Sequence, residues 1–516
     1  MNSYLLYRDS TIEGKHGYYS KRDMIKDLNL EILFRTMAGE DVFVAENVRQ
    51  VMMIPLQTPD EIRYRQDILQ DLCNDMDFMD TLYEFAERQH KAVRLYRDEI
   101  EKNRTRSTGR TGETIGRINF LRKALADLIQ LRDLLTEKQK NYHSEGLQSL
   151  CQRLCRQPLE QYREKADDLD FFVMGGKTSY LFQFGGGMKL DSAIVTDCAR
   201  TGHEPVKQNG LQKLYDKWIK KNMVPINTEP LRKDTEHLKE VTVQYLLNLF
   251  TPVFQQLLSF YTAFAGEIAF YKGAVRFINR MKELMIPLSF PEAKPMGTKD
   301  TSFTYLYELS MAVYLQSCPV GNNAEWKNNR LTLITGANQG GKSTFLRSYG
   351  IAQVLMQSGM PVPAQKFSAP VYRQIFTHFT RSEDEQLSSG RLREELQRMS
   401  NMVGAAVPDS LFLLNESFAS TTEKEGSRIA EGILRAFYEN QITTFMVTHL
   451  FYLARKLYQE QWEGSDFLVA EREEDGTRTY RIIPGEPSHT SYGTDLFYQA
   501  LKEDTKSNTP LQSNGV

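Results

Sequence analysis

Apolar residues recur at three- and four-residue spacing through most of residues 20–150, a pattern typical of helices that pack one face against a core. The clearest stripe lies in residues 119–135, and its members are Leu121, Leu125, Leu128, Leu131 and Leu135. Residues 101–117 interrupt the pattern because they are basic, polar and rich in Gly and Thr, so we expect a loop there. Residues 170–200 change to short β-like runs, which predict a hairpin.

A very long helix is predicted over residues 235–285, and the three prolines of residues 287–295 end it. Within it, residues 241–266 carry no charged side chain, and their length would allow them to cross a bilayer. Pro252 and several amide side chains, such as Gln255, lie in the middle of the run, where lipid would penalise them. We therefore expect a helix buried between protein neighbours and no membrane contact.

The C-terminal third alternates strand and helix. Strand patterns at residues 330–336, 411–417 and 443–449 are separated by helical patterns at residues 342–359 and 426–440. This alternation predicts an α/β domain built on parallel strands, preceded by an all-α region.

The net charge and the cysteine content limit the possible functions and the compartment. The net charge is -2, so any nucleic-acid contact must come from a local patch, for which Lys213, Lys217, Lys220 and Lys221 are the best cluster. Five cysteines, an odd number in a chain of this length, argue against a disulfide framework and for a reducing cytoplasm.

The strongest motif is "GANQGGKST", residues 336–344, which matches G-x-x-x-x-G-K-[ST] between a predicted strand and a predicted helix. Glycines let backbone N–H groups curl around phosphates, the lysine reaches the β- and γ-phosphates, and Ser343 would ligate Mg²⁺. The sequence therefore predicts ATP and Mg²⁺ as cofactors. The predicted nucleotide-binding residues are Gly336, Asn338, Gly340, Gly341, Lys342, Ser343 and Thr344.

A similar run, "GGKTS" at residues 175–179, lacks the first glycine of the motif, because Phe171 stands there. We interpret this run as part of the hairpin turns.

An apolar run ending in Asn415-Glu416 follows, where many P-loop hydrolases carry Asp-Glu. Glu416 is the candidate for polarising water. Asn415 keeps the shape and the oxygen of Asp without its charge, so it would hold a magnesium-bound water more weakly and slow turnover. His449, at the end of the next predicted strand, would hydrogen-bond the γ-phosphate. The predicted catalytic residues are Glu416, His449 and Lys342, and the predicted metal residues are Ser343 and Asn415.

These motifs resemble, in type and order, those of the MutS-family ATPases. The matching stretches are "LITGANQGGKSTFLR", "SGMPVPAQ", "IFTHFTRSEDEQLSSGR", "LFLLNESFASTTEKEG" and "MVTHLFYLARKL", with "IPLQTPDEIRYRQDILQDL" (54–72) upstream. The resemblance implies an ABC-type ATPase head, a helical core with long levers and a clamp. It also implies a homodimer that sandwiches two ATP molecules and that grips duplex or branched DNA.

By the same resemblance, Ser388, Ser389 and Gly390 would contact the partner's nucleotide, and Asn322 would lie at the nucleotide edge. Leu392 and Arg393 replace the hydroxyl residues that the family has after its Ser-Gly-Arg.

The implied domains are an N-terminal segment (1–30), a helical core and lever (31–165), a clamp-like insertion (166–234), a lever helix (235–290), the ATPase domain (291–503) and a disordered tail (504–516). With the core phrase beginning near residue 45, we expect neither a mismatch-reading domain before it nor a Smr domain after the ATPase.

Two other functions stay open at this point. The near-neutral charge favours an ATP-switched scaffold that binds protein or RNA without reading mismatches. A metabolic P-loop kinase is disfavoured by "LSSGR" and His449.

Overall fold

The computed structural model describes residues 3–105, 110–173, 177–184, 190–199, 229–380, 390–473 and 477–487. The chain divides into two compact units. Residues of Glu84–Tyr142 and Leu147–Ala265 form one, here called the helical unit, and residues of Tyr4–Tyr83 and Gly266–Val516 form the other, here called the sheet unit. The lysine cluster 213–221, Ser388, Ser389 and the predicted tail lie outside the described residues.

The helical unit is held together by the predicted leucine stripe. All five leucines lie on α6 (Arg110–Lys138) and are at most 2% exposed. On the same helix, Arg122 donates to Asp167 and Asp170, both at 2.6 Å, and so fixes α6 to α8 (Leu159–Val173). The other elements that lie wholly or partly in this unit are α5 (Met76–Thr105), η1 (Gln139–Asn141), α7 (Glu145–Cys155), β1 (Lys177–Phe184), β2 (Leu190–Ala199) and α10 (Glu229–Glu283).

Four predictions in this region are corrected or confirmed. The loop expected over residues 101–117 is wrong for residues 101–105 and 110–117, which are helical as the ends of α5 and α6. The predicted hairpin is confirmed, because β1 and β2 pair antiparallel. The long helix is also confirmed as α10, with Pro252 inside it. Thr178 and Ser179 of the "GGKTS" run belong to β1 itself, not to a turn.

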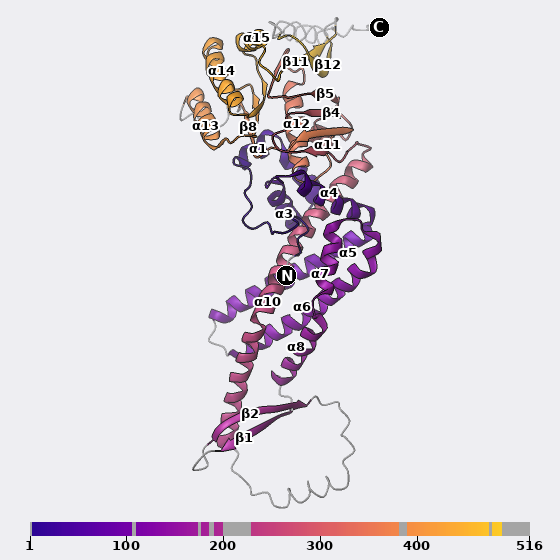
Figure 1. Ribbon diagram of the computed structural model, residues 1–516, viewed down its shortest axis with the longest axis vertical. Helices are drawn as coiled ribbons and strands as arrows, with labels where there is room; N and C mark the ends of the chain where they lie inside the picture. Colours follow the sequence, from indigo (N-terminus) through magenta and orange to yellow (C-terminus); the bar gives the residue numbers. More distant parts are fainter. Residues whose placement is uncertain are drawn as a thin grey trace, which may run out of the picture. The chain divides into compact units, whose positions relative to one another are not determined.

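The sheet unit contains, among its described residues, a six-stranded sheet of order β12-β11-β6-β10-β9-β8 and a four-stranded sheet of order β3-β7-β4-β5 (Figure 1). In the larger sheet, β6 (Leu331–Thr335), β8 (Ile375–Phe379), β9 (Leu411–Asn415), β10 (Thr443–Val447) and β11 (Ser465–Arg472) are parallel, and β12 (Arg478–Pro484) is antiparallel to β11. The predicted parallel α/β domain is therefore confirmed.

The remaining elements of this unit are α1 (Lys21–Asp27), α2 (Leu30–Ala38), α3 (Val42–Met52), α4 (Pro59–Asn74), β3 (Glu292–Lys294), β4 (Thr301–Leu306), α11 (Leu309–Leu315), β5 (Asn322–Trp326), α12 (Lys342–Met356), β7 (Lys366–Pro370), α13 (Arg391–Ala405), α14 (Glu423–Glu439) and α15 (Phe451–Glu460).

Helices cover both faces of the larger sheet, which explains why its strands β6, β9 and β10 are buried along almost their whole length. Successive side chains of a strand point to opposite faces. On β9, Phe412 and Leu414 join the core that α13, α14 and α15 complete with residues such as Met399, Leu434 and Leu453. Between them, Leu413 faces α12, where its Cδ1 would lie 2.7 Å from a Cβ added at Gly350. The sheet thereby holds α12, the helix after the phosphate-loop motif, in a fixed position.

The far end of α12 is anchored by a buried arginine. Arg65 of α4 is fully buried, and its Nη1 donates to the Ser358 carbonyl at 3.0 Å. Its Nη2 donates to the Leu6 carbonyl at 3.0 Å, and its guanidinium lies 5.4 Å from the ring centre of Phe270 on α10. Gly359 has φ +72° and leaves no room for a Cβ, which would lie 2.8 Å from the Cβ of Arg65. This contact joins the N-terminal segment, α4, α10 and α12 within the sheet unit.

No helix in the described part of the chain is long and apolar enough to cross a membrane.

Candidate nucleotide-binding site

The motif "GANQGGKST" forms a loop between the end of β6 and the start of α12. Gly336 and Gly341 adopt φ values of +114° and +90°, which L-residues rarely adopt. Gly341 is the N-cap of α12, so the free N–H groups of that helix end face the loop. The geometry is that of an anion-binding turn at a helix N-terminus.

Lys342 folds back onto the loop. Its side chain is buried, and Nζ donates to the carbonyl oxygens of Gly336 at 2.9 Å and Ala337 at 2.8 Å. Burial lowers the pKa of the lysine to about 8, against a smaller raising effect of the nearby Glu416 carboxylate. A cation is thus held at the mouth of the loop with incomplete charge compensation, which favours an anionic ligand there.

The loop requires glycine at these positions for a second reason, which the sequence did not reveal. A Cβ on Gly336 would lie 2.9 Å from the backbone N of Ala470, and one on Gly340 would lie 2.7 Å from the Cβ of Ala470. On the neighbouring strand, the Tyr480 carbonyl lies 3.1 Å from where a Gly341 Cβ would be. Strands β11 and β12 therefore pack directly against the loop, and glycine alone leaves space for them.

The two candidate metal residues are hydrogen-bonded to each other. Ser343, at the first turn of α12, donates from Oγ to Oδ1 of Asn415 at 2.7 Å. Asn415 ends β9, next to β10 and β8 in the sheet. A hydroxyl and an amide oxygen side by side are hard oxygen donors of the type that Mg²⁺ accepts, usually with water completing its shell.

Glu416 and His449 form the next pair. His449 Nε2 lies 3.0 Å from Glu416 Oε1, and both side chains are partly exposed. This hydrogen bond is the main reason that the pKa of Glu416 lies below its usual value, with desolvation acting against it. An ionised, partly exposed carboxylate in this position can accept a proton from water.

The backbone around Glu416 is held from both sides. Glu416 has φ +55°, its N–H donates to the Val447 carbonyl at 2.8 Å, and Thr380 Oγ1 donates to its carbonyl at 3.1 Å. In the next residue, Ser417 Oγ lies 2.7 Å from Nδ1 of the buried His378. These contacts fix the end of β9 to β8 and β10, and so fix the direction in which the Glu416 side chain projects.

Sequence reasoning missed several residues of this neighbourhood. Glu395 of α13 accepts hydrogen bonds from the Phe418 N–H at 2.5 Å and the Ser420 hydroxyl at 2.6 Å, which ties α13 to the loop after Glu416. Arg478 donates to the Gln339 side chain at 3.0 Å across 139 residues of sequence. Neither contact carries a local signal, because each depends on strand order and helix placement.

Two predicted residues lie at the margin of this group. Asn322 is buried, and its Oδ1 accepts from the Ile482 N–H at 2.7 Å, so this oxygen joins β5 to β12. Gly390 is exposed and caps α13, whose first turn lines a shallow hollow of about 700 Å³ with Ser420. Within the phosphate loop, Asn338 is exposed and Thr344 lies on the first turn of α12.

Two family models match this chain. Residues 332–501 match the family model described as MutS domain V, and residues 57–284 match the one described as MutS2 N-terminal domain. Together the two models take in both the long helices and the larger sheet.

Curated relatives match over a narrower region. The DNA mismatch repair protein MutS of a Thermus thermophilus strain is 31% identical over 170 residues, which is 33% of this chain and 20% of that protein. The DNA mismatch repair protein MutS of Thermotoga neapolitana is 33% identical over 172 residues, 33% of this chain and 21% of that protein. Endonuclease MutS2 of Streptococcus sanguinis is 31% identical over 161 residues, 31% and 20% of the two chains. The matched region thus spans about a fifth of the length of these relatives.

Proposed function

The chain belongs to the MutS family, and on that premise we propose that it is an ATP-dependent DNA-binding protein that binds and hydrolyses Mg²⁺-ATP at the site described above. The observation that carries the proposal is the meeting of three motifs at the carboxyl ends of β6, β9 and β10. These carboxyl ends bring together Lys342, the Ser343–Asn415 hydrogen bond and the Glu416–His449 pair.

The residues present fit ATP and Mg²⁺. Gly336 and Gly341 have positive φ, and the loop glycines leave little space for a side chain. The lysine is buried beside them, and two oxygen donors lie 2.7 Å apart at the first turn of the helix. Bound Mg²⁺-ATP supplies the phosphoanhydride bond and the divalent charge. Gly336, Asn338, Gly340, Gly341, Lys342, Ser343 and Thr344 would hold it, with Ser343 and Asn415 toward the metal.

Glu416 is the proposed general base. Its carboxylate is ionised near neutral pH, since the His449 hydrogen bond lowers further a pKa that is already acidic. His449 orients this carboxylate through Nε2 and would, in the same position, sense the charge lost on hydrolysis. Asn415 in place of an acidic residue predicts weaker metal binding and slower turnover.

We further propose a homodimer in which Ser388, Ser389 and Gly390 of one subunit contact the nucleotide of the other. Gly390 supports this in one respect: it is exposed, and a Cβ built on it would meet nothing within 4 Å, so its surface is accessible. The helices α5, α6 and α10 would act as the core and levers, with β1 and β2 in the clamp, and the protein would work in a reducing cytoplasm. The names of the relatives, which include DNA mismatch repair protein MutS and endonuclease MutS2, support DNA as the partner.

The first experiment measures ATP turnover by the purified protein with Mg²⁺, alone and with duplex or branched DNA. Glu416→Gln, which keeps the hydrogen-bonding shape without the charge, is the matched control. Turnover that DNA changes and that Glu416→Gln abolishes supports the proposal. ATP binding with turnover no greater than in the control would reduce the protein to a nucleotide switch.

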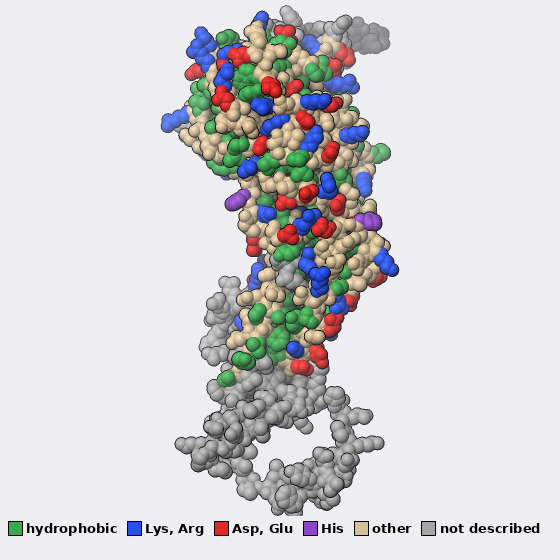
Figure 2. Space-filling model, viewed as in Figure 1, with side chains coloured by type: hydrophobic (Ala, Val, Ile, Leu, Met, Phe, Trp, Pro, Cys, Tyr) green, Lys and Arg blue, Asp and Glu red, His purple; other side chains and the backbone are tan. Residues whose placement is uncertain are grey.

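A second candidate is an ATP-switched scaffold for protein or RNA. It is favoured by the net charge of -2 and by the face in Figure 2, where Lys and Arg alternate with Asp and Glu over the described surface without a large basic area. DNA affinity that falls steeply between low and moderate salt would support the DNA-binding function, since phosphate contacts release counterions. Salt-independent or undetectable DNA binding would favour the scaffold.

A further inference from the structure

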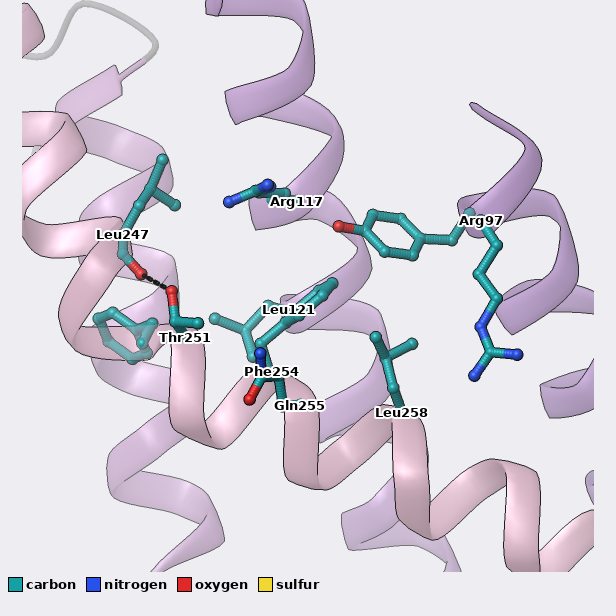
Figure 3. A pocket seen from close by; sticks show the side chains of 10 residues that line it. Arg97, Arg117, Leu121, Leu247, Thr251, Phe254, Gln255 and Leu258 are labelled. Atoms are coloured by element: carbon teal, nitrogen blue, oxygen red, sulfur yellow. Dashed lines mark hydrogen bonds between the residues drawn. The ribbon is translucent and has the colours of Figure 1, made fainter. Parts of the chain in front are cut away.

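A cavity of about 430 Å³ opens between α5, α6 and α10 inside the helical unit (Figure 3). Its apolar lining includes the buried side chains of Tyr96, Leu121 and Leu247. The rings of Tyr96 and Phe254 meet edge to face with their centres 4.9 Å apart. Such a volume and lining lie in the range of small-molecule sites, about 300–1,000 Å³.

Two cationic side chains reach the same cavity from different helices. Arg97 comes from α5 and Arg117 from α6, and Figure 3 shows both beside the apolar lining. Arg97 makes one long hydrogen bond, from Nη2 to Thr262 Oγ1 at 3.5 Å, which leaves most of its donors for other partners. None of the lining residues, all of which the structure describes, carries a carboxylate.

The polar atoms on the third helix are placed differently. Thr251 donates its hydroxyl proton to the Leu247 carbonyl at 3.1 Å, so its oxygen remains an acceptor within the wall. Gln255 is exposed at the cavity, where its amide can meet a polar group of a ligand. Among the residues that line the cavity, the two arginines are the ones that carry charge.

An apolar floor with two guanidinium groups is complementary to one chemical class. A purely apolar ligand would leave the guanidinium of Arg97, with its one long hydrogen bond, beside hydrocarbon, and a bare inorganic anion would leave the aromatic lining exposed to water. A ligand with an aromatic or aliphatic body and one anionic head satisfies both parts, because guanidinium binds carboxylate, sulfonate or phosphate oxygens in bidentate fashion.

We propose that this cavity between α5, α6 and α10 is a binding site for a small amphiphilic anion, with its apolar body against Tyr96, Leu121 and Phe254 and its charged head on Arg97 and Arg117. The site is separate from the nucleotide site, whose residues belong to the sheet unit. A ligand here would connect three helices and so stabilise the helical unit.

The probe is 8-anilinonaphthalene-1-sulfonate, which has an aromatic body and one sulfonate and which becomes fluorescent in apolar surroundings. It is titrated into the full-length protein with saturating Mg²⁺-ATP, which keeps the dye out of the nucleotide site. Its uncharged analogue N-phenyl-1-naphthylamine is titrated in parallel. We expect saturable one-site binding of the sulfonate and at least about tenfold weaker binding of the uncharged analogue, because the charge-assisted hydrogen bonds are missing.

Variants locate the site. The double variant Arg97→Gln/Arg117→Gln is expected to weaken sulfonate binding at least about tenfold and to leave the uncharged analogue unaffected. Arg94→Gln is the matched control, since Arg94 is an exposed arginine one turn away on α5 and does not line the cavity. Gln255→Trp places a large ring at the exposed side of the cavity and should block both dyes.

Three results would overturn the proposal. The first is equal affinity for the charged and uncharged dyes, which would mean that the cavity is only an apolar gap. The second is an unchanged affinity in the double arginine variant, and the third is undisturbed binding in Gln255→Trp. Circular dichroism and thermal unfolding of each variant ensure that a lost signal reports the site and not a lost fold.

Discussion

The replacement of an acidic residue by Asn415 gives the sharpest test of the proposed metal site, through the substitution Asn415→Asp. The two side chains have the same shape, and Asn415 Oδ1 already accepts the Ser343 hydroxyl at 2.7 Å. The variant therefore changes charge without changing packing. Hydrogen bonds to a charged acceptor are about twice as strong as neutral ones, a gain of about 1–1.5 kcal/mol.

At 1.4 kcal/mol per factor of ten, that gain corresponds to roughly tenfold tighter binding of a magnesium-bound water. We expect the Mg²⁺ concentration that half-saturates binding of a fluorescent ATP analogue to fall about tenfold in Asn415→Asp, and ATP turnover to rise. The added carboxylate lies beside Glu416, so the unliganded variant should be no more stable than the wild type.

Asn440→Asp is the matched control. Asn440 is exposed and lies at the C-terminus of α14, immediately before β10 and so at the opposite edge of the sheet from the site. Its substitution should leave the Mg²⁺ dependence unchanged. If Asn415→Asp also leaves the half-saturating Mg²⁺ within about twofold, Asn415 does not face the metal and the reasoning fails.

Further predictions concern the lysine, the histidine and one glycine. The pKa of Lys342 is lowered to about 8, so the charged lysine destabilises the folded state below that pH. This destabilisation disappears as the pH rises toward the ordinary pKa of lysine. Relative to Lys342→Met, the wild type should therefore gain unfolding free energy between about pH 7 and 10, measured by chemical denaturation without nucleotide. The lowered pKa of Glu416 contributes stability above its ordinary pKa and loses it as pH falls through the lowered value. His449→Ala should therefore lower the unfolding free energy at neutral pH, and that difference should vanish in acid; a difference that persists in acid would mean that the pair acts through packing. Gly359→Ala places a Cβ 2.8 Å from the buried side chain of Arg65, at a residue with φ +72°. It should lower the unfolding free energy by about 1–3 kcal/mol in denaturant unfolding. The control is Gly404→Ala, which lies in a helix with nothing within 4 Å of the added Cβ and should be neutral or slightly stabilising.

Local patterns predicted the elements of the larger sheet well. The apolar runs at residues 330–336, 411–417 and 443–449 are β6, β9 and β10. A strand that is buried on both faces is apolar at nearly every position, so it can be recognised from its sequence alone. The same reasoning failed for residues 101–117, where the polar composition suggested a loop but α5 and α6 extend into the segment. A helix needs only part of its length packed, so polar residues near its end can stay helical.

The sequence by itself determined the chemistry of the candidate site, since the phosphate loop, the Asn415-Glu416 pair and His449 are each readable from a few neighbouring residues. The tertiary structure decided which distant residues join them. Arg478 reaches Gln339, Glu395 holds the loop after Glu416, and Ala470 and Tyr480 fill the space beside the glycines only because β11 pairs with β6 and α13 packs on β9. Strand order and the packing of helices on a sheet depend on contacts across more than a hundred residues, and a local pattern contains no record of them.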